Sequence, residues 1–277
     1  MSWISIALSA VVAVAVVPAG YRALIAAGMT RPNYRGQELA FPLGAATVAS
    51  ALVALAPIAP LDALVDERLL EPEFGRWMTY VVGIAFLGLF DDALGRGAAT
   101  DTARGWRGHA GAVLSGNLST GAIKALGALA LASFVLARRG EEGGQYVADI
   151  ALLLLATNML NLFDTGPGRA EKVFGLIAVG LCIGAWTLAP LELLGPLVAP
   201  VVVGAAYTLR ERAMLGDSGS NVLGALAGIW ILLSLDETGR LIALAVIIAV
   251  TAYGEFRSLG TLIERVPPLR YLDSLGR

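Results

Sequence analysis

The stretch "VVGIAFLGLFDDALG", residues 81–95, is a long apolar run, and such runs decide the fold of this chain. It ends in two adjacent carboxylates, Asp91 and Asp92. The rest of the chain has the same character: 57% of the 277 residues are hydrophobic and only 15% are charged. A soluble domain carries about 25% charged residues. The composition therefore predicts a membrane protein with carboxylates at the end of at least one helix.

Long apolar segments recur along the whole chain. A helix needs roughly 20 mostly apolar residues to cross the hydrocarbon core, and fewer when interfacial residues flank it. Nine segments fit: residues 3–27, 41–64, 77–90, 117–137, 146–163, 173–190, 193–209, 220–235 and 240–256. Because lipid offers no hydrogen bonds to the backbone, they must be helices. We expect an all-α polytopic bundle in which residues 1–277 form a single domain.

The basic residues predict the orientation, because short loops rich in Lys and Arg stay in the cytoplasm. Thirteen of the 20 basic residues follow the odd-numbered segments, whereas five follow the even-numbered segments. We therefore expect an amino terminus outside, a carboxyl terminus in the cytoplasm, and a multi-pass location in the cytoplasmic (inner or plasma) membrane.

Charge and cysteine content exclude two classes of protein. The net charge is −2 and no basic patch stands out, so nucleic acid is not an expected partner. A single cysteine, Cys182, rules out an internal disulfide framework.

Three polar motifs fall on the predicted cytoplasmic face. They are "LFDDALG" after the third segment, "NLFDTGPGRAEK" after the fifth and "MLGDSGSN" before the eighth. Each places Asp at a helix end beside Gly, where the chain can turn tightly and present backbone donors to an anion or a metal. We expect the carboxylates of Asp91, Asp92, Asp164 and Asp217 to converge.

A cluster of four carboxylates needs a neutralising cation. Oxygen ligands without a cysteine or histidine cluster favour Mg²⁺ or Mn²⁺, and such a metal usually accompanies phosphate. Basic side chains beside the motifs suit the remaining phosphate oxygens; these are Arg169, Lys172, Arg210 and Arg212. For any one motif alone, solvated or helix-capping residues are the favoured explanation.

Lys124 lies inside the apolar stretch "STGAIKALGALALASF", one to two turns from its cytoplasmic end. Snorkelling to the membrane surface would explain one such lysine. An intramembrane cation near four carboxylates is nevertheless expected to belong to a functional site.

Together the motifs resemble the polyprenyl-phosphate N-acetylhexosamine-1-phosphate transferases, the family of the bacterial phospho-MurNAc-pentapeptide translocase. "GLFDDALG" is similar to that family's aspartate pair, "NMLNLFDTGPG" to its Asn-x-x-Asp loop, and "MLGDSGSNVLG" to its Gly-Asp-x-Gly-Ser loop. "RPNYRGQELAFPLGAA", residues 31–46, is similar to the family's first cytoplasmic loop. The three motifs occur in the family's order and at matching helix ends.

The resemblance implies a membrane enzyme of cell-envelope glycan synthesis. It would transfer a sugar 1-phosphate from a nucleotide diphosphate sugar, a UDP-N-acetylhexosamine derivative being the first choice, to a polyprenyl phosphate, releasing nucleoside monophosphate. By motif matching, Asp217 would bind Mg²⁺ with Asn161 as second ligand, and Lys124 would contact the phosphates. Asp91 or Asp92 would deprotonate or position the lipid phosphate, Asp164 would complete the polar floor, and Ser218 would bind substrate in the third motif.

Departures from the family keep two alternatives open. Pro167 stands where the family commonly has another aspartate, Met214 stands where it often has an aromatic residue, and the only histidine, His109, is not in a His-rich loop. These changes fit a binding protein for lipid phosphate or nucleotide sugar that has lost turnover. A polytopic transporter fits less well, because transporters place polar residues at the membrane midplane. A homodimer and either direct displacement or an aspartyl-phosphate intermediate remain open.

Overall fold

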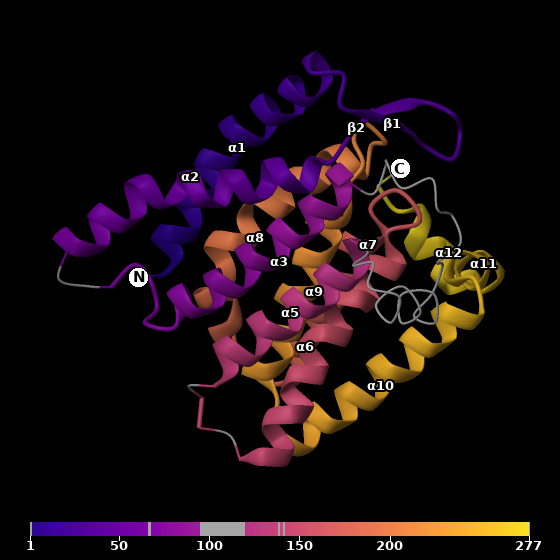
Figure 1. Cartoon of the computed structure of the whole chain (residues 1–277). Coiled ribbons are helices and arrows are strands. Elements are labelled where there is room, and N and C mark those ends of the chain that lie inside the picture. Colours follow the sequence, from indigo (N-terminus) through magenta and orange to yellow (C-terminus); the bar gives the residue numbers. More distant parts are fainter. Residues whose placement is uncertain (1, 66–67, 95–119, 138, 141, 277) are drawn as a thin grey trace.

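The computed structural model describes residues 2–65, 68–94, 120–137, 139–140 and 142–276 (Figure 1). These residues form eleven helices and one two-stranded ribbon. The helices are α1 (Ser2–Ala26), α2 (Leu43–Leu64), α3 (Phe74–Leu94), α5 (Thr120–Leu136), α6 (Gly143–Phe163), α7 (Arg169–Gly184), α8 (Ala189–Thr208), α9 (Asp217–Ser234), α10 (Glu237–Phe256), α11 (Leu259–Arg265) and α12 (Pro267–Ser274). Strands β1 (Thr30–Pro32) and β2 (Glu38–Ala40) pair antiparallel.

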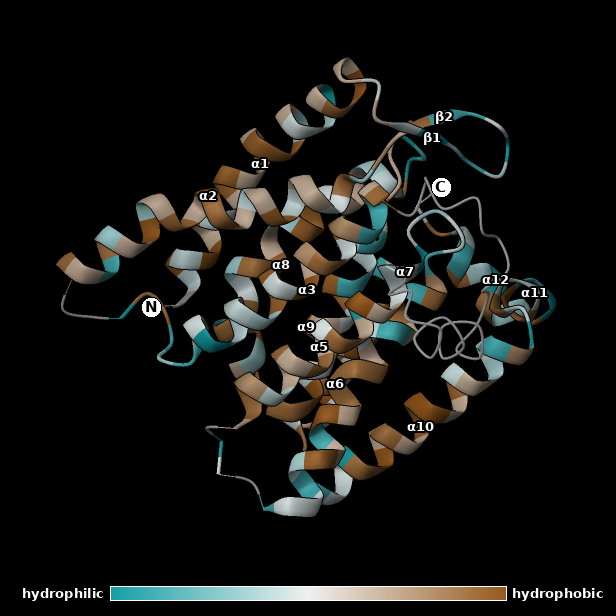
Figure 2. Cartoon of the chain, in the orientation of Figure 1, coloured by the Kyte–Doolittle hydropathy of each residue, from teal (hydrophilic) through white to brown (hydrophobic). Residues whose placement is uncertain are grey.

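The architecture is that of an all-helical membrane protein. In the part of the chain that the structure describes, six helices are long and apolar enough to span a bilayer, namely α1, α2, α3, α6, α8 and α10. Helix α5 is apolar but has only 17 residues. Hydrophobic residues dominate the long helices, whereas polar residues gather on the β1–β2 ribbon (Figure 2). All six helices overlap segments that the sequence predicts as spans.

Helix α9 forms the centre of the bundle. Every residue from Ser218 to Leu232 is buried, and the helix packs against α2, α3, α6, α7 and α8. Helix α3 approaches it closely at Gly88, where an added Cβ would lie 2.5 Å from the carbonyl oxygen of Asp217. The missing side chain therefore lets the end of α3 touch the backbone at the start of α9.

Prolines in α8 are compensated by a neighbouring helix. Pro200 has no N–H, so it cannot donate to the carbonyl of Pro196 four residues earlier. The hydroxyl of Ser9, in α1, donates to that carbonyl instead, at 2.6 Å. An unsatisfied carbonyl is costly in an apolar environment, so this bond stabilises the packing of α1 on α8.

Several helix boundaries differ from those expected from the apolar segments, and three of them bear on the motifs; away from the motifs, α7 ends at Gly184 instead of residue 190, and α8 begins at Ala189 instead of residue 193. Helix α3 continues to Leu94, so Asp91 and Asp92 lie in its last turns rather than after its end. Helix α7 begins at Arg169 and helix α9 at Asp217, so charged residues occupy their first turns. Hydropathy marks the lipid-buried part of a helix, whereas backbone hydrogen bonding continues into the polar region.

The β1–β2 ribbon is tied to the segment before α9. The N–H of Met214 donates to the carbonyl of Ala40, and the N–H groups of Leu43 and Gly44 donate to the carbonyls of Met214 and Leu215. These bonds fix the first loop of the chain beside the third sequence motif.

Helix α10 packs mainly on α6 and leaves most of its surface exposed. Figure 1 shows it leaning away from the bundle before α11 and α12 turn back toward it. The Asp149 carboxylate of α6 is fully buried and accepts hydrogen bonds from Arg240 of α10 and from Gln145, both at 2.7 Å. This ion pair fixes the first turn of α10 to α6.

Candidate functional site

The ammonium of Lys124 joins two of the sequence motifs. Its Nζ forms a hydrogen-bonded ion pair with Oδ2 of Asp217, at the start of α9, and lies 3.9 Å from Oδ2 of Asp91, in α3. The side chains retain between 21% and 29% of their exposure, so a ligand can reach them. One cation and two carboxylates from three helices therefore form an accessible charged centre.

Asp92 has a different position from Asp91, although the two are adjacent in sequence. Its side chain is buried, and its two carboxylate oxygens accept the backbone N–H groups of Asp217 and Ser218, each at 2.9 Å. The residue before α9 is Gly216, which has a φ of 77° and no side chain to cap the helix. Asp92 caps α9 from a neighbouring helix and places a negative charge at its positive end.

Asp164 follows α6 and lies beside the charged centre. Its pKa is raised to about 8, first by burial and then by the charges of Glu171, Asp217 and Asp92, while a hydrogen bond from the backbone of Gly216 opposes the rise. Asp164 is thus close enough to Asp217 and Asp92 for their charges to raise its pKa. Burial and the neighbouring carboxylates therefore favour the protonated form of Asp164.

Asn161 and Ser218 lie where the last turn of α6 meets the first turn of α9. The side-chain oxygen of Asn161 accepts a hydrogen bond from the Ser220 hydroxyl at 2.7 Å, which positions the last turn of α6 against the first turn of α9. Among the described residues, the buried hydroxyl of Ser218 and the buried amide of Asn221 have no hydrogen-bond partner. Buried polar groups are rarely left unpaired, so these two groups mark a polar region suited to a ligand or water.

The four basic residues expected to bind phosphate divide into two pairs. Arg169 and Lys172 bind the C-terminal helix: the guanidinium pairs with the Asp273 carboxylate, and the ammonium donates to the Asp273 carbonyl. Arg210 and Arg212 are exposed in the loop after α8. Among the described residues, no hydrogen bond or ion pair that the structure records joins either pair to Lys124, Asp91 or Asp217.

A cavity of about 210 Å³ opens beside Asp164. Three segments form its walls: the ribbon turn, the loop after α6 and the segment before α9. Its polar groups come from Asp164, Thr165 and Thr208, and Met214 contributes an apolar surface. Asn33, Tyr34 and Glu211 also line it. The Glu211 carboxylate accepts hydrogen bonds from the Asn33 amide and the Tyr34 hydroxyl, which holds the ribbon turn.

Two residues near the site, Glu171 and Arg31, were not predicted from the sequence as site residues. One oxygen of Glu171 accepts a hydrogen bond from Thr208 at 2.5 Å, and the other is buried without a partner among the described residues. Arg31 donates to the backbone carbonyl of Asp92 at 3.1 Å and stacks on Phe41, with its guanidinium carbon 3.7 Å from the ring centre. Both occur in stretches with clear motif similarity, but nothing in those stretches shows that they face the aspartates.

The donor set at the charged centre fits Mg²⁺ or Mn²⁺. These ions bind to one or two carboxylates, with waters and substrate phosphates completing the shell. Asp91 and Asp217 both approach Lys124, so a cation bound at their carboxylates could replace the charge that the ammonium now supplies. Within the described residues no three acidic, histidine or cysteine side chains form a closed protein ligand set.

Comparison with known proteins adds no relative: no family model and no curated protein matches the chain. Residues 95–119, with His109 and the basic residues Arg96, Arg104 and Arg107, lie outside the described part of the structure.

Proposed function

We propose that the protein is a metal-dependent sugar-1-phosphate transferase of the cytoplasmic membrane. It takes the sugar 1-phosphate from a nucleotide diphosphate sugar and gives it to a polyprenyl phosphate. The observation that carries this proposal is the position of Lys124 between Asp91 and Asp217. Asp164, whose pKa responds to the charge of Asp217, lines an open cavity. Transfer between two phosphates requires charge neutralisation and positioning of this kind.

The reaction balances without a redox partner. An oxygen of the lipid phosphate forms a bond to the phosphorus that carries the sugar. The bond between that phosphorus and the bridging oxygen of the donor breaks, and nucleoside monophosphate leaves with the electron pair. The same residues serve direct attack and a route through an aspartyl phosphate, in which an Asp oxygen forms the first bond.

Each residue has a role in this proposal. Lys124 neutralises charge on the donor phosphates, and Asp91 positions the lipid phosphate and accepts its proton. Asp217 would hold Mg²⁺, with Asn161 nearby, and the metal would withdraw charge from the pyrophosphate. Asp92 keeps the first turn of α9 in place, so its contribution is positional.

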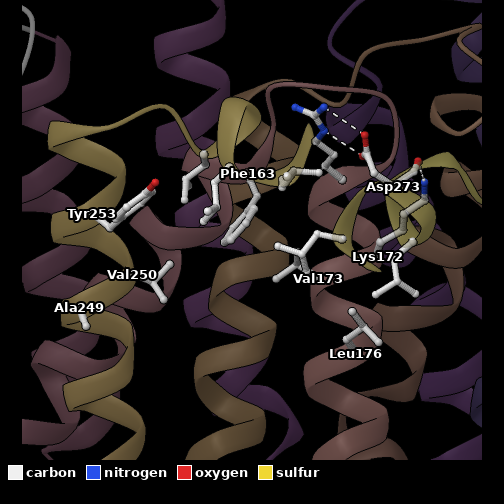
Figure 3. Close-up of a pocket in the computed structure, with 14 residues that line it drawn as sticks. Phe163, Lys172, Val173, Leu176, Ala249, Val250, Tyr253 and Asp273 are labelled. Carbon is white, nitrogen blue, oxygen red and sulfur yellow. Dashed lines mark hydrogen bonds and ion pairs between the residues drawn. The ribbon is translucent and has the colours of Figure 1, made fainter. Parts of the chain in front are cut away.

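The surroundings suit one polar and one apolar substrate. The cavity beside Asp164 can receive the nucleotide from water. An apolar pocket of about 410 Å³ lies between α6, α7, α10 and the C-terminal helices, with Phe163 and Tyr253 among its lining residues (Figure 3). An isoprenoid chain can contact the α10 side of this pocket, at Ala249, Val250 and Tyr253, from the bilayer.

The proposal includes a membrane topology and a cellular setting. In it the chain crosses the membrane nine times with its amino terminus outside, so that the site would face the cytoplasm and its nucleotide substrate. The product would serve cell-envelope glycan synthesis. The family resemblance also implies a homodimer.

The decisive experiment measures nucleoside monophosphate release by the purified protein in lipid nanodiscs. The assay contains Mg²⁺, undecaprenyl phosphate and one of a panel of UDP-sugars, and omits each component in turn. Asp91→Asn and Asp217→Asn should reduce release at least a hundredfold, as loss of a transition-state contact does. Glu237→Gln, an exposed carboxylate at the start of α10, is the matched control and should retain activity.

Release that depends on lipid, metal and both aspartates supports the transferase and identifies its sugar. Full activity in Asp217→Asn contradicts the assignment of this residue to the metal. Absence of release from every donor, together with tight retention of lipid phosphate or nucleotide sugar, would instead identify a binding protein.

A further inference from the structure

An ion pair joins the C-terminal helix to the start of α7. Nε and Nη2 of Arg169 donate to the two carboxylate oxygens of Asp273 at 2.9 and 3.0 Å. Both side chains are only 9% exposed. A buried two-bond contact between a guanidinium and a carboxylate fixes orientation as well as distance, unlike an exposed ion pair.

The same guanidinium supports the loop of residues 164–168. Its Nη1 donates to the Thr165 hydroxyl at 3.2 Å, and its Nε would lie 2.7 Å from a Cβ added to Gly166. The backbone N–H of Arg169 donates to the carbonyl of Gly166 at 3.2 Å. The loop therefore packs directly on Arg169. It carries Asp164 and forms one wall of the 210 Å³ cavity.

Docking of α12 does not depend on the Asp273 carboxylate alone. Lys172 donates to the backbone carbonyl of Asp273, while Leu269 and Leu272 line the apolar pocket. Figure 3 shows Lys172 beside Asp273, with Val173 and Leu176 below them. A change in the carboxylate thus disturbs the orientation of Arg169 while other contacts still hold the helix.

We propose that Asp273 is a positioning residue: it orients Arg169, and Arg169 holds the 164–168 loop so that Asp164 and the cavity wall face the site. The kinetic consequence rests on the proposed transferase function, whereas the order of the loop does not. Asp273 lies on the side of the apolar pocket away from Ala249, Val250 and Tyr253 of α10, and in this arrangement it contacts Arg169 rather than the reacting phosphates (Figure 3).

Asp273→Asn is the informative variant, because it keeps the shape and removes the charge. We expect faster hydrogen–deuterium exchange in residues 164–168, with unchanged exchange in α9. A charged hydrogen bond of this kind contributes enough for about a tenfold effect. The KM for the nucleotide sugar should rise about tenfold, while the KM for the lipid phosphate stays unchanged.

Two further variants separate positioning from general stability. Arg169→Lys retains the positive charge but lacks the planar guanidinium that binds both carboxylate oxygens. It should therefore show the same faster exchange of residues 164–168, and the same rise in the KM for the nucleotide sugar, as Asp273→Asn. Arg270→Gln removes an exposed charge from the same helix and should behave as wild type. Asp273→Glu keeps the carboxylate, so its KM for the nucleotide sugar should lie between those of the wild type and Asp273→Asn.

The outcomes distinguish this proposal from the proposed function. Unchanged exchange of the loop in both Asp273→Asn and Arg169→Lys would overturn the proposal. A uniform rise in exchange throughout the protein, with no separation of the two KM values, would also overturn it, because it indicates general stability. If the wild-type protein released no nucleoside monophosphate, the proposed transferase function would be wrong. The exchange measurements alone would then decide whether Asp273 orders the 164–168 loop.

Discussion

Asp92, near the end of α3, accepts the backbone N–H of Asp217, at the start of α9, with a distance of 2.9 Å. This bond crosses 125 positions in sequence and unites two of the three motifs. The adjacent carboxylate of Asp91 faces Lys124 instead. The aspartate pair therefore combines a structural residue with a residue exposed to ligand.

Substitution at the two positions should separate stability from turnover. Asp92→Ala leaves two N–H groups at the start of α9 without a partner, and loss of a helix cap costs about 0.5–2 kcal/mol. We expect a lower melting temperature for Asp92→Ala and little change for Asp91→Asn. Nucleotide release should nevertheless fall in both. Equal melting temperatures for the two variants would contradict the capping role.

The close contact at Gly88 predicts a steric effect on the site. In Gly88→Ala the new methyl group would meet the backbone of Asp217 and Ser218 at 2.5–2.7 Å, so α3 and α9 must separate. Overpacking of this kind costs about 1–3 kcal/mol. Melting temperature and activity should both fall, as measured by differential scanning fluorimetry and nucleotide release.

Gly180→Ala provides the control for this prediction. Gly180 lies in α7, and an added Cβ there would have no atom within 4 Å outside its own helix neighbourhood. This variant should match wild type, because alanine favours helix formation over glycine. Similar losses in both variants would show that the effect does not come from the α3–α9 contact.

Removal of the Lys124 charge should make the protein more responsive to metal. In Lys124→Gln the carboxylates of Asp91 and Asp217 lose their shared cation, so their repulsion should lower the melting temperature in EDTA. Millimolar Mg²⁺ should raise that temperature more in the variant than in wild type. Equal shifts would argue that Mg²⁺ does not bind at these two carboxylates.

Asp164 predicts a pH dependence of stability without metal. Its pKa is 3.8 as a reference and about 8 in the folded protein, so the folded state binds more protons than the unfolded state between these values. Its stabilising contribution is complete below about pH 4 and is lost as the pH rises through 8. The melting temperature of wild type relative to Asp164→Asn should therefore fall from pH 5 to pH 8. A constant difference over this range would contradict the raised pKa.

Much of the helical architecture follows from hydropathy, because long apolar runs leave the backbone no alternative in lipid. The approach of Lys124 to Asp217 also follows from the motifs. Other features depend on neighbours that no local pattern reveals. Asp92 and Asp91 have identical local chemistry, yet the packing of α3 on α9 buries only Asp92. The residues next to Arg169 in the sequence predict a phosphate ligand for it. Its partner in the structure is instead the carboxylate of Asp273, which is 104 positions away and which no local pattern indicates.

The pair of carboxylates around Lys124 also has a consequence for biosynthesis. Asp91 precedes the lysine in the chain, whereas Asp217 is translated 93 residues after it. When α5 enters the bilayer, Asp91 of α3 is already available to accompany the ammonium, and Asp217 arrives with α9 much later. In the order of synthesis, therefore, one counter-ion of the ammonium precedes it and the other follows it.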